Sequence, residues 1–335
     1  MISKASPNPG KTLIIHSGGI GDLLLALPAM RFFRHALRQF PLYLMGHSER
    51  LALVAYDLKA ETIHSVEQAG MAYFYLDDAF LPSPLCSFFS SFGLILSFSG
   101  KGGQTLSKNL EKAGAARVLN LPSFPSEGPK VHVSDYLIEL LREKGFEGEV
   151  ADHPLQLSKE ALNFSRDYLA RSGLKENERI LAIHPGSGNP AKNWSPSHFA
   201  GIADWAARRA RVLLISGPAQ DGVREVKENL RKAAPLIAEN LSLLQLAAIL
   251  RRCTAYLGND SGITHLASSL GLPTIALFGP TDPEVWGPRG TSVRIIFGAR
   301  PDPPFFSGAP IHRCAPSPIN LKPDEVIAVL APLLG

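Results

Sequence analysis

The sequence has few of the residues that mark several protein classes. Its 335 residues include three cysteines, Cys86, Cys253 and Cys314, which are widely spaced and form no CxxC pair. This argues against a disulfide framework or a zinc site and fits a reducing compartment. No run reaches the roughly 18 apolar residues of a membrane span, and the first residues lack a signal-peptide core. We therefore expect a cytoplasmic protein.

Charge of either sign is also sparse. Charged residues make up 19% of the chain, and the formal net charge is +4. That excess is too small to indicate nucleic-acid binding, but it suits an anionic small molecule or an anionic membrane surface. A hydrophobic content of 45% is typical of a globular protein, and the length suggests two domains. No internal repeat or low-complexity tract is evident.

Short apolar segments alternate with helical patterns along the whole chain, which predicts an α/β fold with parallel sheets. Several segments are apolar on both faces, as expected when helices cover both sides of a sheet. The predicted strands of the first half are Thr12–His16, Leu42–Gly46, Leu94–Phe98 and Arg117–Leu121. Those of the second half are Ile180–His184, Val212–Ser216, Thr254–Gly258, Thr274–Phe278 and Val293–Phe297.

A boundary between two doubly wound domains is expected after Asp152-His153-Pro154. The predicted N-terminal domain is 1–160 and the C-terminal domain 161–320. Residues 321–335 should form a closing helix that packs back toward the N-terminal domain. Domains of this class bind ligands at the carboxyl ends of their strands, so we expect the site in a central cleft between them.

A glycine-rich turn follows the first predicted strand. Gly18, Gly19 and Gly21 permit a tight turn and close approach of a ligand to the backbone. A dinucleotide-binding fingerprint would need a third glycine where this chain has Leu24, so an NAD-dependent oxidoreductase is disfavoured. Asp22 begins the next helix. It is either a cap for free backbone amides or a carboxylate able to accept a proton from a hydroxyl nucleophile.

The same predicted helix carries a stripe of basic residues on one face. Its members are spaced so as to share one face of a helix: Arg31, Arg34, His35 and Arg38. The stripe is either a solvated face or a docking surface for anionic lipid or a phosphorylated acceptor.

Two strand ends in the second half are rich in small and hydrogen-bonding residues. The segment from His184 to Trp194 combines small residues with Lys192, which suits phosphate oxygens although no Walker motif is present. The segment Asp260-Ser261-Gly262 precedes a helix whose first amides attract anions. His265 lies near the start of that helix and is a further candidate for ligand contact.

Three blocks of the sequence are SGGIGDLLLALPAMR, HPGSGNPAKNW and GNDSGITHLASSLGLPTIALFGPTDP. In order and spacing they resemble glycosyltransferase family 9, the heptosyltransferases of lipopolysaccharide core assembly. The resemblance implies a GT-B fold and transfer of a heptose from ADP-heptose to a lipid-linked acceptor, with inversion and without a metal or other cofactor. The chain has no DxD motif, which agrees with metal-free chemistry.

The resemblance also implies roles for particular residues. Asp22 matches the family's general base. The remaining matches are donor contacts: Ser187 and Lys192 at the diphosphate, Asp260, Ser261, Gly262 and His265 at the nucleotide and sugar, and Asp221 at the ribose. Ser261 replaces the threonine of many members and keeps the hydroxyl. Acceptor contacts are expected from the N-terminal domain, with Lys101, Arg50 and His132 as candidates and peripheral contact with the inner membrane as a consequence.

Two alternative functions stay open beside this one. A GT-B enzyme with another nucleotide-sugar donor, or a sugar-nucleotide epimerase, would share the fold but form another product. A catalytically silent sugar-nucleotide-binding protein would bind nucleotide without turnover.

Overall fold

The computed structural model describes residues 10–100, 102–125, 130–217, 221–297 and 320–335. The chain forms two compact units, Met1–Gln156 and Leu157–Gly335. The division therefore falls between residues 156 and 157, where the sequence had suggested 160 and 161.

The first unit is built on a five-stranded parallel sheet in the order β3-β2-β1-β4-β5. Its central strand β1 begins the described fold, and Thr12 of β1 aligns with Leu42 and Leu94 of the neighbouring strands. The strands are β1 Thr12–His16, β2 Leu42–Gly46, β3 Thr62–Ser65, β4 Leu94–Phe98 and β5 Val118–Leu121.

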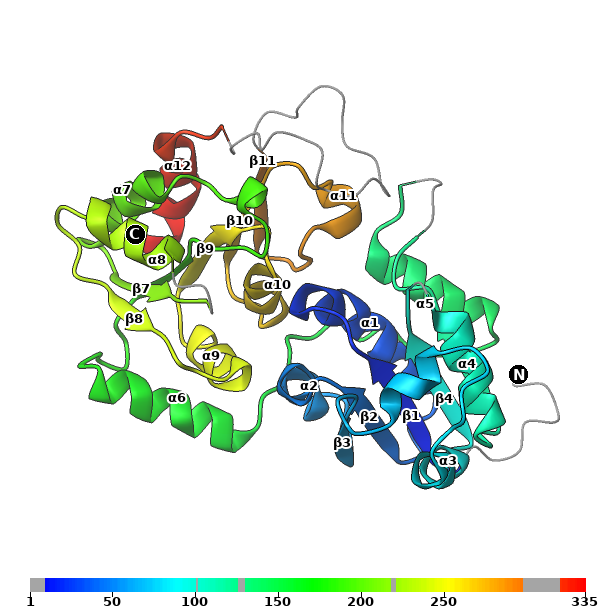
Figure 1. The fold of residues 1–335 in the computed structure, drawn as a ribbon. Helices are drawn as coiled ribbons and strands as arrows, with labels where there is room; N and C mark the ends of the chain where they lie inside the picture. The colour runs from blue at the N-terminus through cyan, green and yellow to red at the C-terminus, as the bar shows by residue number, and fades with distance from the viewer. Residues whose placement is uncertain (1–9, 101, 126–129, 218–220, 298–319) are drawn as a thin grey trace. The chain divides into compact units, whose positions relative to one another are not determined.

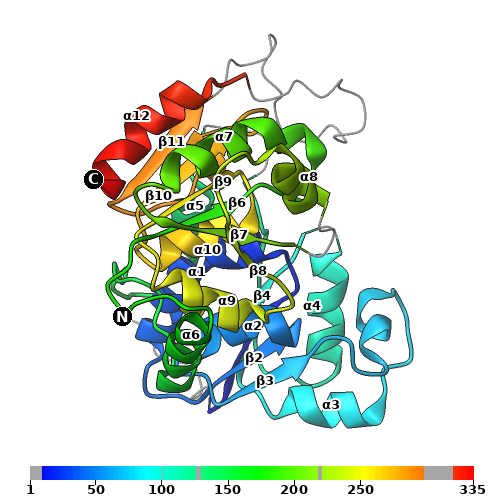
Figure 2. The same ribbon diagram turned by 90° about the vertical axis from the view of Figure 1, so that its left-hand side faces the viewer.

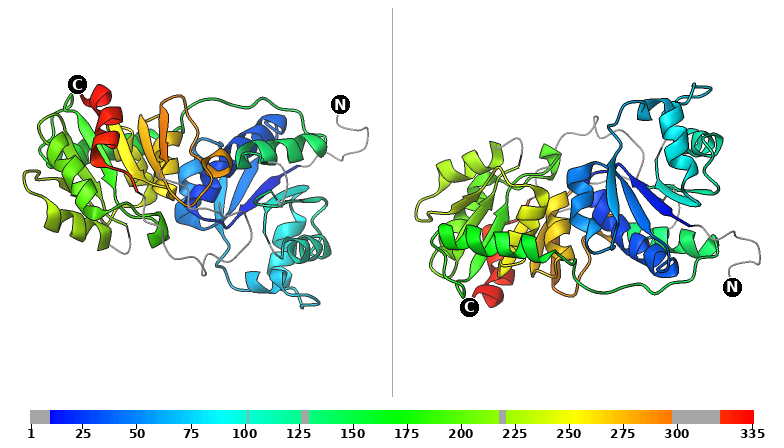
Figure 3. Two further views of the ribbon diagram at one scale, coloured as in Figure 1. Left: turned by 90° about the horizontal axis from the view of Figure 1, so that it is seen from above. Right: turned by 90° about the horizontal axis from the view of Figure 1, so that it is seen from below.

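Helices cover both faces of this sheet (Figure 3). One face packs on α3, α4 and the 3-10 helix η1, and α1 packs against α5. The helical elements are α1 Ile20–Ala36, α2 Ser48–Ala55, η1 Met71–Tyr75, α3 Ser83–Ser90, α4 Gly103–Lys112 and α5 Val133–Glu143.

The second unit contains a six-stranded parallel sheet in the order β11-β10-β9-β6-β7-β8. Its central strands are almost fully buried because helices lie on both sides. The strands are β6 Ile180–His184, β7 Arg211–Ile215, β8 Leu236–Ala238, β9 Ala255–Asn259, β10 Thr274–Phe278 and β11 Val293–Phe297.

Figures 1 and 2 show α7, α8 and α12 on one side of this sheet and α6, α9 and α10 on the other. The first group shares an apolar core with alternate residues of the strands, such as Leu181 and Ile183 of β6. The helical elements are α6 Lys159–Arg171, η2 Pro190–Lys192, α7 Pro196–Ala206, α8 Asp221–Asn229, α9 Leu243–Leu250, α10 Gly262–Ser269, α11 Pro283–Trp286 and α12 Pro323–Leu334.

The closing helix predicted for residues 321–335 is present as α12. Its apolar stripe, Val326, Leu330 and Leu334, is buried in the core of the second unit, where α12 packs against α7. The spacing of four residues places the three side chains on one face, which α7 and the sheet cover. Contact of this helix with the N-terminal domain stays a prediction.

The strand orders fix where each unit exposes its loops. In the first sheet, successive strands are added on one side of β1 and then, from β4 onward, on the other side. In the second sheet the same reversal of strand order occurs between β6 and β9. Ligands of doubly wound sheets bind at these reversal points, outside the carboxyl ends of the strands. The loops that follow β1 and β4 in one unit, and β6 and β9 in the other, are therefore the candidates for function.

Candidate functional site

The turn between β1 and α1 is held close to two polar side chains. A Cβ atom on Gly18 would lie 3.0 Å from Cε1 of His16 and 3.0 Å from Cβ of Asp22, so any larger residue would push the turn outward. At Gly19 a Cβ would lie 3.3 Å from Oδ2 of Asp22, and Gly21 lies in the first turn of α1. These glycines serve close packing within the turn.

Asp22 lies at the third position of α1, after Gly19 as the N-cap. Its Oδ2 accepts a hydrogen bond from the Gly19 N–H at 2.9 Å. The carboxylate thus caps the helix from within its first turn, and the cap also fixes its orientation at the end of β1. The capping interpretation of Asp22 holds in this form, and it leaves the half-buried carboxylate in place for a further role.

His16, which the sequence analysis did not single out, ends β1 beneath this turn. It is 5% exposed, and its ring centroid lies 5.8 Å from that of Phe98. Burial lowers the pKa of His16 to about 4, while the nearby Asp22 raises it and Arg50 lowers it. The imidazole is therefore neutral at pH 7.

Two of the acceptor candidates have structural partners in the first unit. Arg50 Nη1 donates to the carbonyl of Gly18 at 2.8 Å and so holds the glycine turn. His132 is 8% exposed and caps α5, with Nδ1 accepting from the Ser134 N–H at 3.2 Å. The third candidate, Lys101, lies outside the described residues.

The basic stripe of α1 is largely engaged inside the first unit. Arg31 forms a two-pronged ion pair with Asp57, whose side chain is fully buried, at 2.7 and 2.8 Å. Arg31 also donates to the His153 carbonyl at 2.9 Å, and His35 Nδ1 accepts from the Glu149 N–H at 3.2 Å. The other two members are Arg34, which bonds to backbone carbonyls, and Arg38, which is exposed. Arg31 and His35 thus hold the segment around 149–153, and no contact of the stripe tests the docking interpretation.

In the second unit the loop after β6 brings together two predicted donor contacts. Lys192 Nζ lies 2.6 Å from Oδ2 of Asp260, across 68 residues of sequence. The two side chains are 24% and 7% exposed, so the ion pair is partly withdrawn from water. Ser187 Oγ donates to the Asn189 carbonyl at 2.7 Å and so shapes the same loop. The structure thus places a cation and a carboxylate together at the reversal point of the sheet.

The start of α10 lies beside this ion pair. Ser261 is the N-cap of α10, and Gly262 is its first residue. Ser261 Oγ lies 3.2 Å from Oγ1 of Thr264, which in turn lies 3.0 Å from the buried Tyr256 hydroxyl. The first amides of α10 follow Asp260 directly in the chain, and free amides at a helix start attract anions.

Two histidines lie close to this helix start. His184 ends β6, and its Nδ1 lies 3.4 Å from Ser261 Oγ. Burial lowers the pKa of His184 to about 4, so this ring is also neutral at pH 7. His265 follows in α10 and is 7% exposed. His184 therefore adds no charge beside the start of α10.

Asn259 is a further residue that the sequence analysis missed. It ends β9, is fully buried, and accepts from the Trp194 N–H at 3.0 Å while donating to the Pro185 carbonyl at 2.7 Å. Its neighbour Asp260 was singled out as part of the segment Asp260-Ser261-Gly262, which precedes a helix start. The only local signal for Asn259 is a polar residue at the end of an apolar strand.

Three further predictions concern the ribose contact Asp221, a metal site and a membrane span. Asp221 is the first residue of α8, and its side chain is outside the description. Among the described residues, no three His, Cys, Asp or Glu side chains are grouped so as to hold a metal ion. Within the same residues, no helix combines the length and apolar character needed to cross a membrane.

The geometry of each unit suits a different chemical task. The second unit offers one lysine and oriented backbone amides, which are the groups that bind phosphate oxygens. The first unit offers a carboxylate held by a backbone amide beside a neutral imidazole, an arrangement that can accept a proton.

Comparisons with known proteins identify the family of the chain. Residues 123–309 match the model of glycosyltransferase family 9 (heptosyltransferase). Lipooligosaccharide heptosyltransferase 2 of Haemophilus influenzae is 32% identical over 36% of this chain and 37% of its own. Lipopolysaccharide heptosyltransferase 2 of Escherichia coli K12 is 28% identical over 54% and 53%. The chain thus spans about half or less of the length of these relatives.

Solved structures match over nearly the whole chain. A family 9 glycosyl transferase from Veillonella parvula superposes with a TM-score of 0.78 at 18% identity, covering 98% of both chains. The E. coli ADP-heptose LPS heptosyltransferase II gives a TM-score of 0.73 at 19% identity, covering 97% of this chain and 98% of that one. These matches confirm the predicted fold class, and the family model covers more than half of the residues. The chain belongs to glycosyltransferase family 9, the heptosyltransferases.

Proposed function

We propose that the protein is an inverting, metal-independent glycosyltransferase that moves a heptose from ADP-heptose to a lipopolysaccharide inner-core acceptor. In this proposal the second unit binds the donor and the first supplies the general base. The observation that carries it is the Lys192–Asp260 pair beside the start of α10, at the reversal point of the second sheet. The acceptor is lipid-linked, so the protein would reach it by peripheral contact with the inner membrane.

Lys192 can keep its bond to Asp260 and still contact a diphosphate. An ammonium group has three N–H donors, and the 2.6 Å contact with Asp260 uses one of them. Because the pair is partly buried, the lysine is held in place before the donor arrives. A cation that is already oriented stabilises developing charge without the cost of rearrangement.

The departing group would carry its charge toward the second unit. As the acceptor oxygen attacks the anomeric carbon, the bond to the diphosphate breaks and negative charge grows on the departing phosphate oxygen. Lys192 Nζ and the first amides of α10, from Gly262 onward, are the groups placed to stabilise that charge. Ser187, Ser261 and His265 complete the proposed donor contacts, with Asp221 at the ribose.

Asp22 would take the proton from the acceptor hydroxyl. Its Oδ2 accepts the Gly19 N–H, which orients the carboxylate. The carboxylate is thereby held in one orientation at the start of α1, where it could accept the proton. The neutral ring of His16 adds no charge that would compete for the proton.

Calorimetric titration with ADP, UDP, GDP and NAD, without added metal, tests the donor side. Selective binding of ADP, followed by heptose transfer from ADP-heptose to an inner-core acceptor, is the expected result. Preference for UDP or GDP would keep the fold but overturn the donor. Binding of ADP without turnover on any heptose acceptor would instead favour a silent binding protein.

A further inference from the structure

The loop that carries Lys192 is held at both ends by one side chain. Asn259 is fully buried at the end of β9. Its Nδ2 donates to the Pro185 carbonyl at 2.7 Å, where the loop leaves β6, and its Oδ1 accepts from the Trp194 N–H at 3.0 Å, just before α7. One amide therefore closes a loop of ten residues, 185–194, against the neighbouring strand.

Only an amide of this length satisfies both loop ends. A carboxylate at 259 would keep the acceptor for Trp194 but would place a charge against the Pro185 carbonyl. An isosteric leucine would leave the carbonyl and the N–H without their partner in a buried place, which is costly. Asn259 Nδ2 also lies 3.4 Å from Asn193 Oδ1, a long contact that adds to the same end of the loop.

The same residue governs both members of the Lys192–Asp260 pair. Asp260 follows Asn259 in the chain, so the strand that carries one also carries the other. Lys192 lies two residues before Trp194, whose N–H is fixed by the amide. The contacts of Asn259 thus hold the loop that carries Lys192 against the strand that leads to Asp260.

We propose that Asn259 is a positioning residue for the diphosphate site: its amide holds the 185–194 loop so that Lys192 and Ser187 are arranged for phosphate before the donor binds. The inference rests on the proposed function. It assigns Asn259 no contact with the donor, and its effect passes through the loop.

The test compares Asn259→Leu with a matched control, Asn109→Leu. Asn109 is also a buried asparagine, 3% exposed, whose Nδ2 donates to the Phe74 and Leu76 carbonyls in the first unit at 3.0 and 2.9 Å. We expect Asn259→Leu to weaken ADP binding roughly tenfold or more, and Asn109→Leu to leave it within about twofold. In transfer assays KM for the donor should rise more than kcat falls.

Hydrogen exchange gives a readout that needs no nucleotide. Amides of 186–194 should exchange faster in Asn259→Leu than in the wild type, with no such change in Asn109→Leu. Unchanged exchange of the loop, or unchanged ADP affinity, would overturn the inference. Failure of the wild-type protein to bind ADP would overturn the proposed function instead, while faster loop exchange in the variant would still support the clamp.

A second variant tests the amide chemistry itself and guards against misfolding of the leucine variant. Asn259→Asp is isosteric, and its carboxyl can donate to the Pro185 carbonyl only when protonated. Burial favours the protonated form. The ADP affinity of Asn259→Asp, relative to the wild type at the same pH, should therefore recover as pH falls from 8 to 5.5. A ratio that stays constant or falls would contradict the assigned role.

Discussion

In both units a central strand ends in a buried histidine, but the loops that follow these strands differ. His16 ends β1 and His184 ends β6, and burial lowers the pKa of each to about 4. The ring of His16 lies under a short turn among two charges, Asp22 and Arg50. That of His184 lies beside a hydroxyl, Ser261, under a longer loop. A short turn can orient one carboxylate, whereas a longer loop can surround a larger anion.

The charged groups of the two loops are also stabilised differently. The carboxylate of Asp22 is held by a backbone N–H, that of Gly19. The ammonium of Lys192 is held by an opposite charge, Asp260, in a partly buried place. This contrast is what we expect if the first loop moves a proton and the second binds a diphosphate.

Replacement of Asp22 should distinguish the roles of the two loops most strongly, because it should affect transfer but not ADP binding. Asp22→Asn keeps an oxygen for the Gly19 N–H but cannot accept a proton, so heptose transfer should fall by roughly 10²–10⁴-fold. ADP affinity, measured by calorimetry, should stay within a few-fold of the wild type. A parallel loss of ADP binding would show that Asp22 is a donor ligand or a purely structural residue.

Acid should destabilise both units through the two histidines. Each has a folded pKa of about 4 against 6.5 for the free residue, so the unfolded chain binds more protons between these values. The contribution of each neutral, buried histidine to the free energy of unfolding is complete above pH 6.5 and is lost as pH falls toward 4. Between pH 7 and 5 we expect a loss of about 2 kcal/mol per histidine.

The two units can be followed separately in that experiment. All three tryptophans, Trp194, Trp205 and Trp286, belong to the second unit. In His184→Asn, the free energy of unfolding measured by tryptophan fluorescence should therefore depend less on pH than in the wild type. In His16→Asn, the same weaker dependence should appear when unfolding is followed by circular dichroism. Equal pH dependence of the wild type and both variants would mean that the rings titrate normally.

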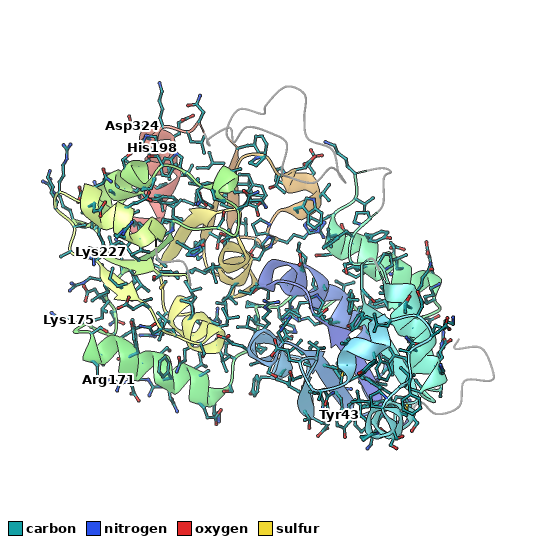
Figure 4. The ribbon with its side chains drawn as sticks, viewed as in Figure 1. Tyr43, Arg171, Lys175, His198, Lys227 and Asp324 are labelled. Atoms are coloured by element: carbon teal, nitrogen blue, oxygen red, sulfur yellow. The ribbon has the colours of Figure 1, made fainter. Side chains whose placement is uncertain are left out.

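Loss of the lysine should affect the second loop alone. Lys192→Ala removes a charged hydrogen-bond donor and leaves the poorly exposed Asp260 without its cation. We expect ADP binding to weaken by roughly 1–3 kcal/mol in calorimetry. Lys227→Ala, at an exposed lysine of α8 in the same unit (Figure 4), is the control and should bind ADP as the wild type does. Unchanged affinity in Lys192→Ala would remove this lysine from the site.

Single glycine substitutions in the two loops should have the smallest effects and compare the loops most locally. A Cβ on Gly18 would press on His16 and Asp22 at 3.0 Å, whereas a Cβ on Gly188 would meet no atom within 4 Å. Gly18→Ala should therefore lower transfer about tenfold by displacing the turn, at a cost of roughly 1–2 kcal/mol. Gly188→Ala should be close to neutral in both transfer and ADP binding. Equal activity of the two variants would show that the first turn tolerates displacement.

Local pattern was sufficient for most of the secondary structure. Strands such as Thr12–His16 and Ile180–His184 were predicted at their observed bounds because uninterrupted apolar runs mark buried parallel strands. The edge strands β3 and β8 were missed. In Thr62–Ser65 the only apolar residue, Ile63, lies between polar residues. The strand Leu236–Ala238 has only three residues. An edge strand needs less apolar surface, so its pattern is weak.

The sequence alone determined the fold class, the loops that follow the central strands and the family, because these depend on local periodicity and on contiguous motifs. Tertiary structure decided which side chains act together. The Lys192–Asp260 pair joins residues 68 apart and the Asn259–Trp194 bond residues 65 apart. Arg31 of the basic stripe pairs with the buried Asp57, 26 residues away, and the spacing of the stripe does not indicate that partner. Such partners meet only when parallel strands bring their ends to one edge of a sheet, which local sequence does not encode.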